Sequence, residues 1–570
     1  LRTGDLVTGI SRLLALACLV GLVGMLPWLS GKDPALTILR ATSSDREPTP
    51  EILNSIRKSI GIDGGPLHVI GHWLAGAARG DLGRSWVSGT DVGPDAVDAF
   101  GVSLSLMAAA LGVGVIVAAA LVLPALRDGL RGRPRPRGGA ASAVLISLPE
   151  YLLAPILMLV LAVYLRILPP FGWGSPEKVI MPALSLGLPT GGYLGGLVSD
   201  AVTATFSERW VATWSTAGIR GRPLAGAVLR RALAPLTGQV ALVVVALTGG
   251  AVAVEKIFAI PGLGRELLDA ASAQDVPALQ AQILLLLALA LTTGVIAGAV
   301  RRLLMGRAAG AGGLTAPPPV EHPGRAARVI AVSGAALLAL MVAVGIRRDP
   351  YAVVADKLAQ PSAALPLGAD SLGRDVLARV AHGAVSTVSG AVIVTVVCFV
   401  IALLVGLAPR AATGFIEVAN AAPPILAGLI VAGVSGPSAT GAAIAVAGVG
   451  WAPLASHAAG LVAENRQRPD VLLAPVLGEG RVRITLTRVL PAVVGPLARH
   501  AALRLPGKAL ALAALGFLGL GAQSPAPEWG LVLSDALPYI ERAPWAVATP
   551  AAALVILSIT SVAASRSMRR

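Results

Sequence analysis

The sequence contains little cysteine, histidine or charge. Only Cys18 and Cys398 occur among its 570 residues, each inside an apolar run, which excludes a disulfide framework and a thiolate metal site. Among the six histidines only His68 and His72 have helical spacing, and we interpret them as one face of a solvated helix, so no metal site is predicted. Charged residues make up 14% of the chain and hydrophobic residues 55%. A soluble core does not need so much apolar content, so we predict a polytopic membrane protein.

The sequence also lacks the GxxxxGK[ST] loop with which ATPases cradle nucleotide phosphates. The nearest fragment, residues 504–508, has neither the first glycine at the required spacing nor the Ser or Thr. Asp370, Arg374 and Asp375 lie in a glycine-punctuated stretch before an apolar run, which indicates a salt-bridged loop at the membrane surface and not a catalytic group. We therefore predict that the chain is not an enzyme, has no catalytic residue and holds no cofactor.

Negative charge is scarce as well, with 31 acidic residues against 46 basic ones and a net charge of +15. The basic residues cluster in short segments between apolar runs, where they set membrane orientation, so no nucleic acid partner is predicted. Residues 127–137 carry five arginines against one aspartate, whereas residues 29–98 carry nine acidic and seven basic side chains. The positive-inside rule places 127–137 in the cytosol and 29–98 outside. The run from Leu13 to Trp28 is interpreted as an uncleaved anchor, because no small-residue cleavage site follows it.

Twelve apolar runs are predicted to span the membrane, with both termini in the cytosol. They cover about residues 13–28, 100–125, 141–165, 179–199, 236–254, 279–300, 326–346, 384–408, 413–434, 438–460, 492–520 and 544–564. A Gly- and Pro-rich stretch in the middle predicts a flexible cytosolic linker. The predicted fold is therefore all-α, with six spans in residues 1–305, a linker at 306–325 and six spans in residues 326–570, arranged as a parallel repeat.

A polar loop occurs once in each predicted half, at residues 200–235 and 461–490. In each, a valine precedes a glycine by seven residues and two arginines follow the glycine. The residues concerned are Val211, Gly218, Arg220 and Arg222 in the first loop and Val471, Gly478, Arg481 and Arg483 in the second. Counting crossings places both loops in the cytosol. A rigid helix-turn-helix between spans, once per half, is what a membrane protein needs if a cytosolic partner must push on it.

Ionisable residues are predicted to be almost absent within the spans, with only Glu417, near the end of one span, in such a position. A secondary transporter can also have twelve spans in two parallel repeats, but ion coupling requires intramembrane carboxylates or histidines. Their scarcity argues against that class, and a membrane-anchored receptor or enzyme is disfavoured because no catalytic constellation is present. A path lined by small residues suits a peptide-like solute whose selection occurs on a separate binding protein.

Short motifs along the chain resemble those of one transport family. They are Gly80–Ser85 (GDLGRS), Val254–Phe258 (VEKIF), Pro261–Arg265 (PGLGR), Asp275–Pro277 (DVP), Pro366–Asp375 (PLGADSLGRD), Phe517–Gly521 (FLGLG), Trp529–Gly530 (WG) and Ala543–Trp545 (APW). In this order they are similar to the motifs of the two permease subunits of a bacterial dipeptide/oligopeptide/nickel-type ABC importer, fused end to end. Ala369 replaces the threonine that the family has in PLGTDxLGRD.

The resemblance implies two type I importer permease halves in a bacterial cytoplasmic membrane, in contact with lipid. It implies two ABC ATPase domains as cytosolic partners, which bind ATP and Mg, and an extracytoplasmic substrate-binding protein. The implied solute is a dipeptide or oligopeptide, with nickel or a metallophore left open as the alternative.

The resemblance also assigns roles to residues. The two polar loops match the family's ATPase-coupling motif, and the coupling residues are Trp210, Val211, Gly218, Arg220, Arg222, Val471, Leu472, Gly478, Arg481 and Arg483. The acidic position of that motif is Ala212 in the first loop and Leu472 in the second, and Trp214 replaces a small residue. Contact with the binding protein is expected from segments 29–98, 257–277, 347–382 and 521–543, through Asp81, Arg84, Arg265, Asp370, Arg374, Asp375 and Trp529.

Overall fold

The computed structural model confirms the predicted all-α class. It describes residues 3–26, 33, 35, 36, 38, 39, 47–59, 65–134, 139–146, 148–273, 275–305, 325–407 and 409–567. Within these residues the regular structure is helical, and β-pairing is limited to three isolated bridges. Nearly all of the predicted linker lies outside the described residues.

The chain divides into two compact units. Unit 1 comprises Leu1–Ala96, Leu267–Ile283 and Leu340–Pro550, and unit 2 comprises Val97–Glu266, Leu284–Ala339 and Ala551–Arg570. Each unit takes segments from both predicted halves. The division into halves at residues 305 and 326 follows from the sequence repeat and stays a prediction.

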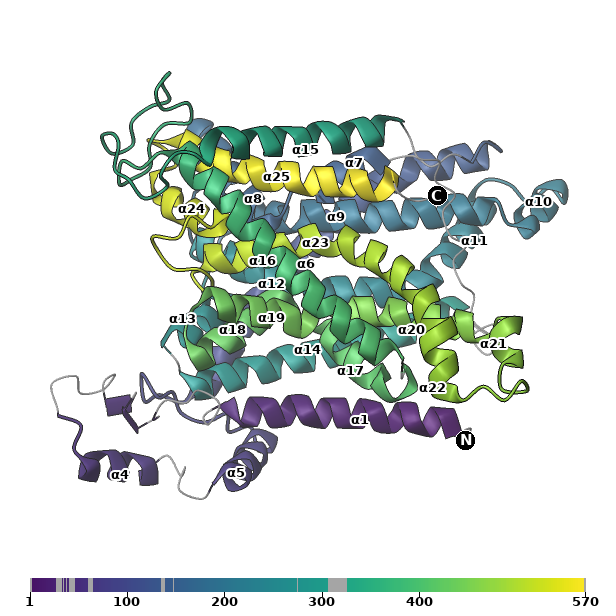
Figure 1. The fold of residues 1–570 in the computed structure, drawn as a ribbon, viewed down its shortest axis with the longest axis horizontal. Coiled ribbons are helices and arrows are strands. Elements are labelled where there is room, and N and C mark those ends of the chain that lie inside the picture. The colour runs from purple at the N-terminus through teal and green to yellow at the C-terminus, as the bar shows by residue number, and fades with distance from the viewer. Residues whose placement is uncertain are drawn as a thin grey trace. The chain divides into compact units, whose positions relative to one another are not determined.

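Unit 1 is built around α16 and α23, which pack along each other and are both contacted by α19 and α20 (Figure 1). Helix α1 packs against α17. The helices of this unit are α1 (Thr3–Gly24), α4 (Pro50–Ser59), α5 (Pro66–Ala78), α16 (Val376–Gly406), α17 (Pro409–Ala421), α18 (Pro424–Ser435), α19 (Ala439–Gly450), α20 (Ala452–Arg466), α21 (Pro469–Leu473), α22 (Arg481–Ile484), η5 (Thr485–Val489), α23 (Leu490–Leu518), α24 (Trp529–Ala536) and η6 (Leu537–Tyr539).

Unit 2 is built around α9, against which α7, α8, α11 and α12 pack. Its helices are α7 (Gly139–Ile146), α8 (Glu150–Leu157), η2 (Met158–Tyr164), α9 (Pro176–Phe206), α10 (Arg209–Thr216), α11 (Arg222–Leu233), η3 (Ala234–Leu236) and α12 (Thr237–Phe258). Gly187 and Gly191 of α9 let the backbone of α6 approach closely, because a Cβ at either would lie 2.6–2.7 Å from a carbonyl oxygen of α6. Five helices are divided between the units: α6 (Val92–Leu130), α13 (Leu263–Ala273), α14 (Val276–Met305), α15 (Arg325–Gly345) and α25 (Pro544–Ser567).

Eight helices in the described residues are long and apolar enough to cross a membrane. They are Val92–Leu130, Arg222–Phe258, Val276–Leu304, Ala327–Gly345, Val376–Gly406, Ala439–Arg466, Arg481–Leu518 and Pro544–Ser561. The predicted span 413–434 is not one straight helix but α17 and α18, bent by 92°. Pro423 and Pro424 cause this break, since neither can donate a backbone hydrogen bond to the preceding turn. The total of twelve spans stays a prediction.

Candidate functional site

The first polar loop is a helix-turn-helix formed by α10 and α11. Val211 of α10 is buried in a cluster with Phe206 of α9 and with Leu224 and Val228 of α11. This cluster anchors the loop to the long helix that precedes it. The loop therefore has a packed inner side.

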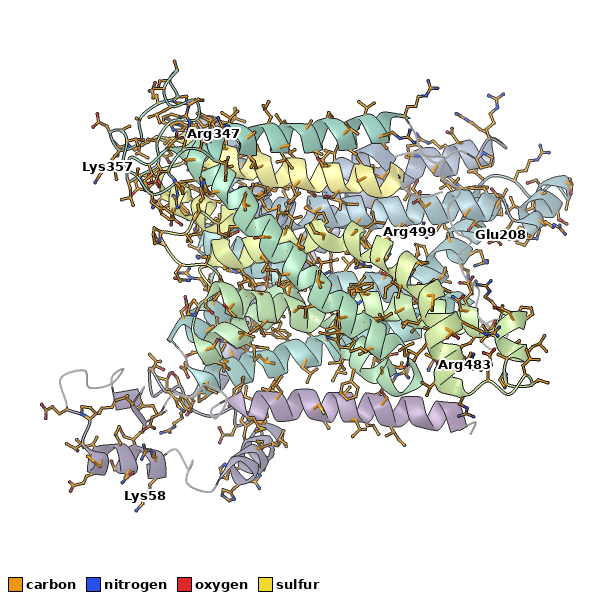
Figure 2. All side chains as sticks on the ribbon, in the orientation of Figure 1. Lys58, Glu208, Arg347, Lys357, Arg483 and Arg499 are labelled. Carbon is orange, nitrogen blue, oxygen red and sulfur yellow. The ribbon has the colours of Figure 1, made fainter. Side chains whose placement is uncertain are left out.

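Polar contacts close the same loop. The carboxylate of Glu208, just before α10, accepts a hydrogen bond from the Trp210 indole (2.6 Å) and pairs with Arg231 of α11 (3.0 Å). Trp210 and Trp214 pack edge to face, with ring centroids 5.3 Å apart. Glu208 thus ties the first helix of the loop to the second, and Figure 2 marks its position beside α10.

The second polar loop reaches a similar arrangement with shorter helices, α21 and α22. Arg488 of η5 pairs with Glu479 (2.5 Å) and donates to the carbonyl of Asp470 (3.0 Å). The hydrogen bond from Arg488 lowers the pKa of Glu479 below its ordinary value. The folded carboxylate therefore keeps its charge to lower pH than the unfolded one, and this pair is lost only as the pH falls through the lowered pKa.

The two loops share backbone geometry at the repeated positions. Gly218 and Gly478 have φ of 83° and 80°, the left-handed conformation that a side chain would strain. Val211 and Val471, seven residues earlier, are both buried. Of the remaining predicted coupling residues, Trp210 is half-buried. The others are exposed: Arg220, Arg222, Leu472, Arg481 and Arg483.

The outer surfaces of the loops differ. The second loop exposes six large apolar side chains: Leu472, Leu473, Val476, Leu477, Val482 and Leu486. We call these six residues the apolar patch. In the first loop the exposed large apolar side chains are Trp214 and Ile219, each just over one-third exposed. Large apolar side chains exposed on a polar loop are the kind of feature that marks interaction sites.

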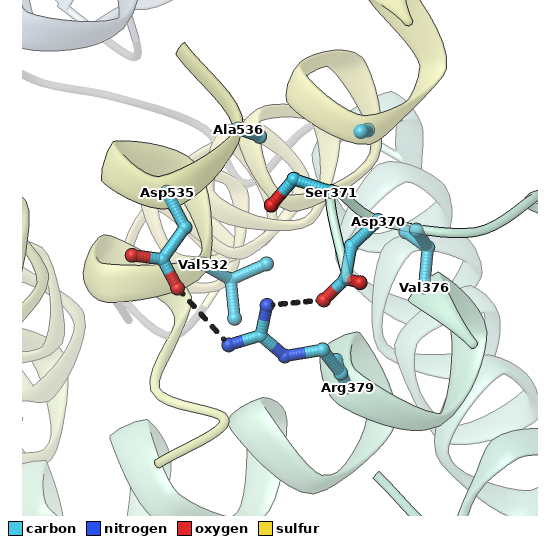
Figure 3. A pocket seen from close by; sticks show the side chains of 8 residues that line it. Asp370, Ser371, Val376, Arg379, Val532, Asp535 and Ala536 are labelled. Carbon is cyan, nitrogen blue, oxygen red and sulfur yellow. Dashed lines mark hydrogen bonds and ion pairs between the residues drawn. The ribbon is translucent and has the colours of Figure 1, made fainter. Parts of the chain in front are cut away.

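At the other end of α16 and α23 from this loop, as Figure 1 shows, the second-half motif 366–375 forms a buried charge network. Asp370 accepts the backbone N–H groups of Leu372 and Arg374 (both 2.9 Å) and pairs with the guanidinium groups of Arg374 (2.7 Å) and Arg379 (2.8 Å). Arg379 also pairs with Asp535 of α24 (3.3 Å; Figure 3). The network ties the segment before α16 to α24.

Competing effects set the pKa of Asp370. Burial acts to raise the pKa, but the hydrogen bonds from the backbone N–H groups and the two guanidinium charges together lower it below the ordinary value. The stabilisation is therefore present above the unfolded pKa and is lost as the pH falls through the folded one. At neutral pH the Asp370 carboxylate is therefore charged.

Four residues predicted to contact a binding protein lie inside the fold. Asp370, Arg374, Asp375 and Trp529 are all buried. Asp375 caps α16 by accepting the N–H of Leu377 (2.8 Å). A buried side chain cannot itself touch a docked protein, so these residues shape their loop and do not form its surface.

The first-half motif joins two segments of unit 1 that lie far apart in sequence. Asp275, from the Asp-Val-Pro stretch, accepts hydrogen bonds from the Ser85 hydroxyl and from the Trp86 backbone N–H (3.1 Å). Asp81 and Arg84 remain exposed, and Arg84 pairs with Asp91 (3.0 Å) at the surface. The role of these two as binding-protein contacts stays a prediction, as does that of half-buried Arg265.

Each unit also holds a buried glutamate to which the sequence analysis assigned no role. In unit 2, Glu255 accepts the Ser103 hydroxyl (2.6 Å) and the backbone N–H of Arg265 at the start of α13 (3.0 Å). In unit 1, Glu528 accepts the Thr387 hydroxyl (3.2 Å) and the N–H of Gly530 at the start of α24 (3.0 Å). Each glutamate therefore links the N-terminus of a short helix to a hydroxyl group on a long helix.

Replacing Glu528 by alanine is expected to lower the free energy of unfolding by about 1–3 kcal/mol, because buried N–H groups lose their acceptor. Glu528→Gln keeps one acceptor oxygen and is expected to lose less. Thermal unfolding in detergent measures both, with the exposed Glu541→Ala as control, expected to stay within about 0.5 kcal/mol of the parent. If the alanine variant and the control unfolded at the same temperature, the capping role of Glu528 would be contradicted.

The predicted scarcity of ionisable residues within spans is wrong for the span 492–520. Helix α23 carries Arg499, His500, Arg504 and Lys508, and the first of these is labelled in Figure 2. The segment Arg481–Leu518, which contains this helix, is nevertheless long and apolar enough to cross a membrane. Glu417, the residue that was predicted, pairs with Arg12 of α1 (2.7 Å) and is half exposed.

Comparisons with known proteins match both parts of the chain. The profile of a family described as "Binding-protein-dependent transport system inner membrane component" matches residues 139–309 and again residues 399–569. The peptide transport system permease protein SapC of Escherichia coli O6:H1 is 36% identical over 202 residues, which is 33% of this chain and 67% of that protein. The di/tripeptide transport system permease protein DppC of Pseudomonas aeruginosa is 35% identical over 204 residues, 34% of this chain and 67% of its own length. The metal-staphylopine import system permease protein CntB of Staphylococcus aureus is 29% identical over 281 residues, 49% of this chain and 89% of that protein.

Proposed function

Because the chain belongs to the family of binding-protein-dependent transport system inner membrane components, and carries its domain twice, we propose that it supplies both membrane halves of one ATP-driven importer. It is a multi-pass inner membrane protein and a permease of the peptide ABC importer type. This membership favours the importer over the ion-coupled secondary transporter.

The observation that carries the mechanism is the paired geometry of the two polar loops. Each buries a valine, turns at a left-handed glycine and is closed by an arginine–glutamate pair. In our proposal each loop docks on a separate ATPase domain in the cytosol. The loop transmits the movement of that domain to the membrane helices against which it packs. ATP and Mg bind to those partners, and both termini of this chain lie on the same side.

The solute that we propose is a dipeptide, an oligopeptide or a similar small molecule, delivered by an extracytoplasmic binding protein. The names of SapC and DppC support a peptide. A metallophore is the second candidate, because the similarity to CntB covers almost half of this chain. The exposed residues Asp81 and Arg84 are our candidates for contact with the binding protein.

A pull-down of the tagged chain in mild detergent tests this proposal. We expect a P-loop ATPase to co-purify and to be lost when residues 209–222 or 470–483 are deleted. ATPase activity of the eluate and a size-exclusion profile of each deletion variant distinguish lost docking from lost folding. A chain that purifies alone and transports under an ion gradient would contradict the importer.

A further inference from the structure

The short helices α13 and α24 begin in the same way, against a hydroxyl group on a long helix. The Ser103 hydroxyl of α6 accepts the backbone N–H of Leu263, the first residue of α13 (2.8 Å). The Thr387 hydroxyl of α16 accepts the N–H of Trp529, the first residue of α24 (3.4 Å). Ser103 and Thr387 also correspond in position, because each lies eleven residues after the first residue of its helix.

A carboxylate completes each arrangement through matching atoms. The hydroxyl on α6 donates to one carboxylate oxygen of Glu255 (2.6 Å), whose other oxygen accepts the N–H of Arg265, the third residue of α13 (3.0 Å). The hydroxyl on α16 donates to one carboxylate oxygen of Glu528 (3.2 Å), whose other oxygen accepts the N–H of Leu531, the third residue of α24 (3.0 Å). Both carboxylates thus supply an acceptor that the first turn of a helix lacks.

The two carboxylates come from different positions in the chain. Glu255 lies in the last turn of the long helix α12, four residues before its left-handed C-cap Ala259 (φ 54°). In α23, the residue four before the left-handed C-cap Gly519 is the buried Leu515. Glu528 instead directly precedes the short helix α24. Unit 1 therefore has a leucine where unit 2 has its glutamate.

Unit 2 has a glycine at the reciprocal position. Gly262 directly precedes α13, as Glu528 precedes α24. A Cβ at Gly262 would lie 2.5 Å from a carboxylate oxygen of Glu255, so this carboxylate fills the space that a side chain from position 262 would enter. The backbone of Gly262 is not left-handed, and the turn does not itself require a glycine.

We propose that each unit needs one carboxylate at this place and that either chain position can supply it, which makes Glu255 and Glu528 matched positioning residues for α13 and α24. Without the carboxylate, the N–H of the third helix residue loses its acceptor, and an unpaired donor of this kind is unfavourable. The start of the short helix then loosens. The two helices belong to segments 257–277 and 521–543, so both carboxylates support a surface expected to meet the binding protein, a role that rests on the proposed function.

Moving the carboxylate within unit 2 tests the proposal. In the full chain in detergent, Glu255→Ala is expected to speed amide hydrogen exchange in the first turn of α13, residues 263–266, about tenfold, because the N–H of Arg265 loses its acceptor. Gly262→Glu alone is also expected to speed exchange, since two carboxylates then compete for one space. The two substitutions together are expected to return exchange to within about twofold of the parent. Exchange in this double variant as fast as in Glu255→Ala would overturn the proposal.

Each unit is the control for the other. Glu255→Ala is expected to leave exchange in residues 529–532 unchanged, and Glu528→Ala is expected to speed it there and not in residues 263–266. Equal acceleration of both segments by either variant would indicate general loosening and overturn the positioning role. Asp269→Ala, which removes an exposed carboxylate from α13, is expected to change neither segment, and acceleration equal to that of Glu255→Ala would also overturn the role. Exchange needs no partner protein, so failure of the importer function is read separately, from the pull-down.

Discussion

Replacing Arg379 by methionine is expected to lower the free energy of unfolding by about 3–5 kcal/mol, one of the two largest effects that this structure predicts. The Arg379 side chain is almost fully buried, and it pairs with both Asp370 and Asp535. Without it, Asp370 keeps only Arg374 as a cationic partner, and Asp535 loses its ion pair. Thermal unfolding of the purified chain in detergent, followed by intrinsic tryptophan fluorescence, measures the loss.

Arg84→Met is the matched control for this substitution. Arg84 also pairs with an aspartate, Asp91, but the two side chains are 76% and 69% exposed. A pair so open to solvent contributes about 0–1 kcal/mol. If both variants melted alike, the buried network would not be the element that holds the segment before α16 against α24.

The second large effect is expected at the apolar patch, where Leu473→Asp should abolish co-purification of the ATPase. Leu473 is 59% exposed, so an aspartate there does not disturb the packing of the loop. In a docked complex the same carboxylate would be buried without a partner, which opposes binding by several kcal/mol. The amount of ATPase that elutes with the tagged chain is the readout.

Val354→Asp provides the control for Leu473→Asp. Val354 is 55% exposed, similar to Leu473, but it lies in the segment 347–382 that is predicted to be outside the cell. The same change of apolar to acidic is therefore expected to leave ATPase binding intact. Equal loss in both variants would indicate a general effect on folding and contradict docking at the apolar patch.

The fold class and the two loops could be predicted from sequence because their signals are local. Apolar runs and the Val-x6-Gly spacing need no knowledge of tertiary contacts, and the left-handed conformation of Gly218 and Gly478 agrees with the role expected of a glycine in a tight turn. The break at Pro423 was visible in the sequence too. The run 413–434 was nevertheless treated as one span, although Glu417 and Asn420 interrupt its apolar part before the prolines.

The charge networks could not be predicted because they depend on contacts between distant segments. Nothing near Glu528 in the sequence indicates that it meets Thr387, and nothing near Asp275 indicates Ser85. The basic residues of α23 are a different case. The four-residue spacing of His500, Arg504 and Lys508 could be read from the sequence alone and was overlooked.

The unlike outer surfaces of the two loops bear on the number and kind of ATPase partners. A homodimeric ATPase offers two identical grooves, and those cannot match both the largely polar first loop and the apolar patch equally well. Two different ATPase subunits can each match one loop. Since a single chain carries both loops, it would then fix the order of the pair, and every assembled complex would contain one copy of each.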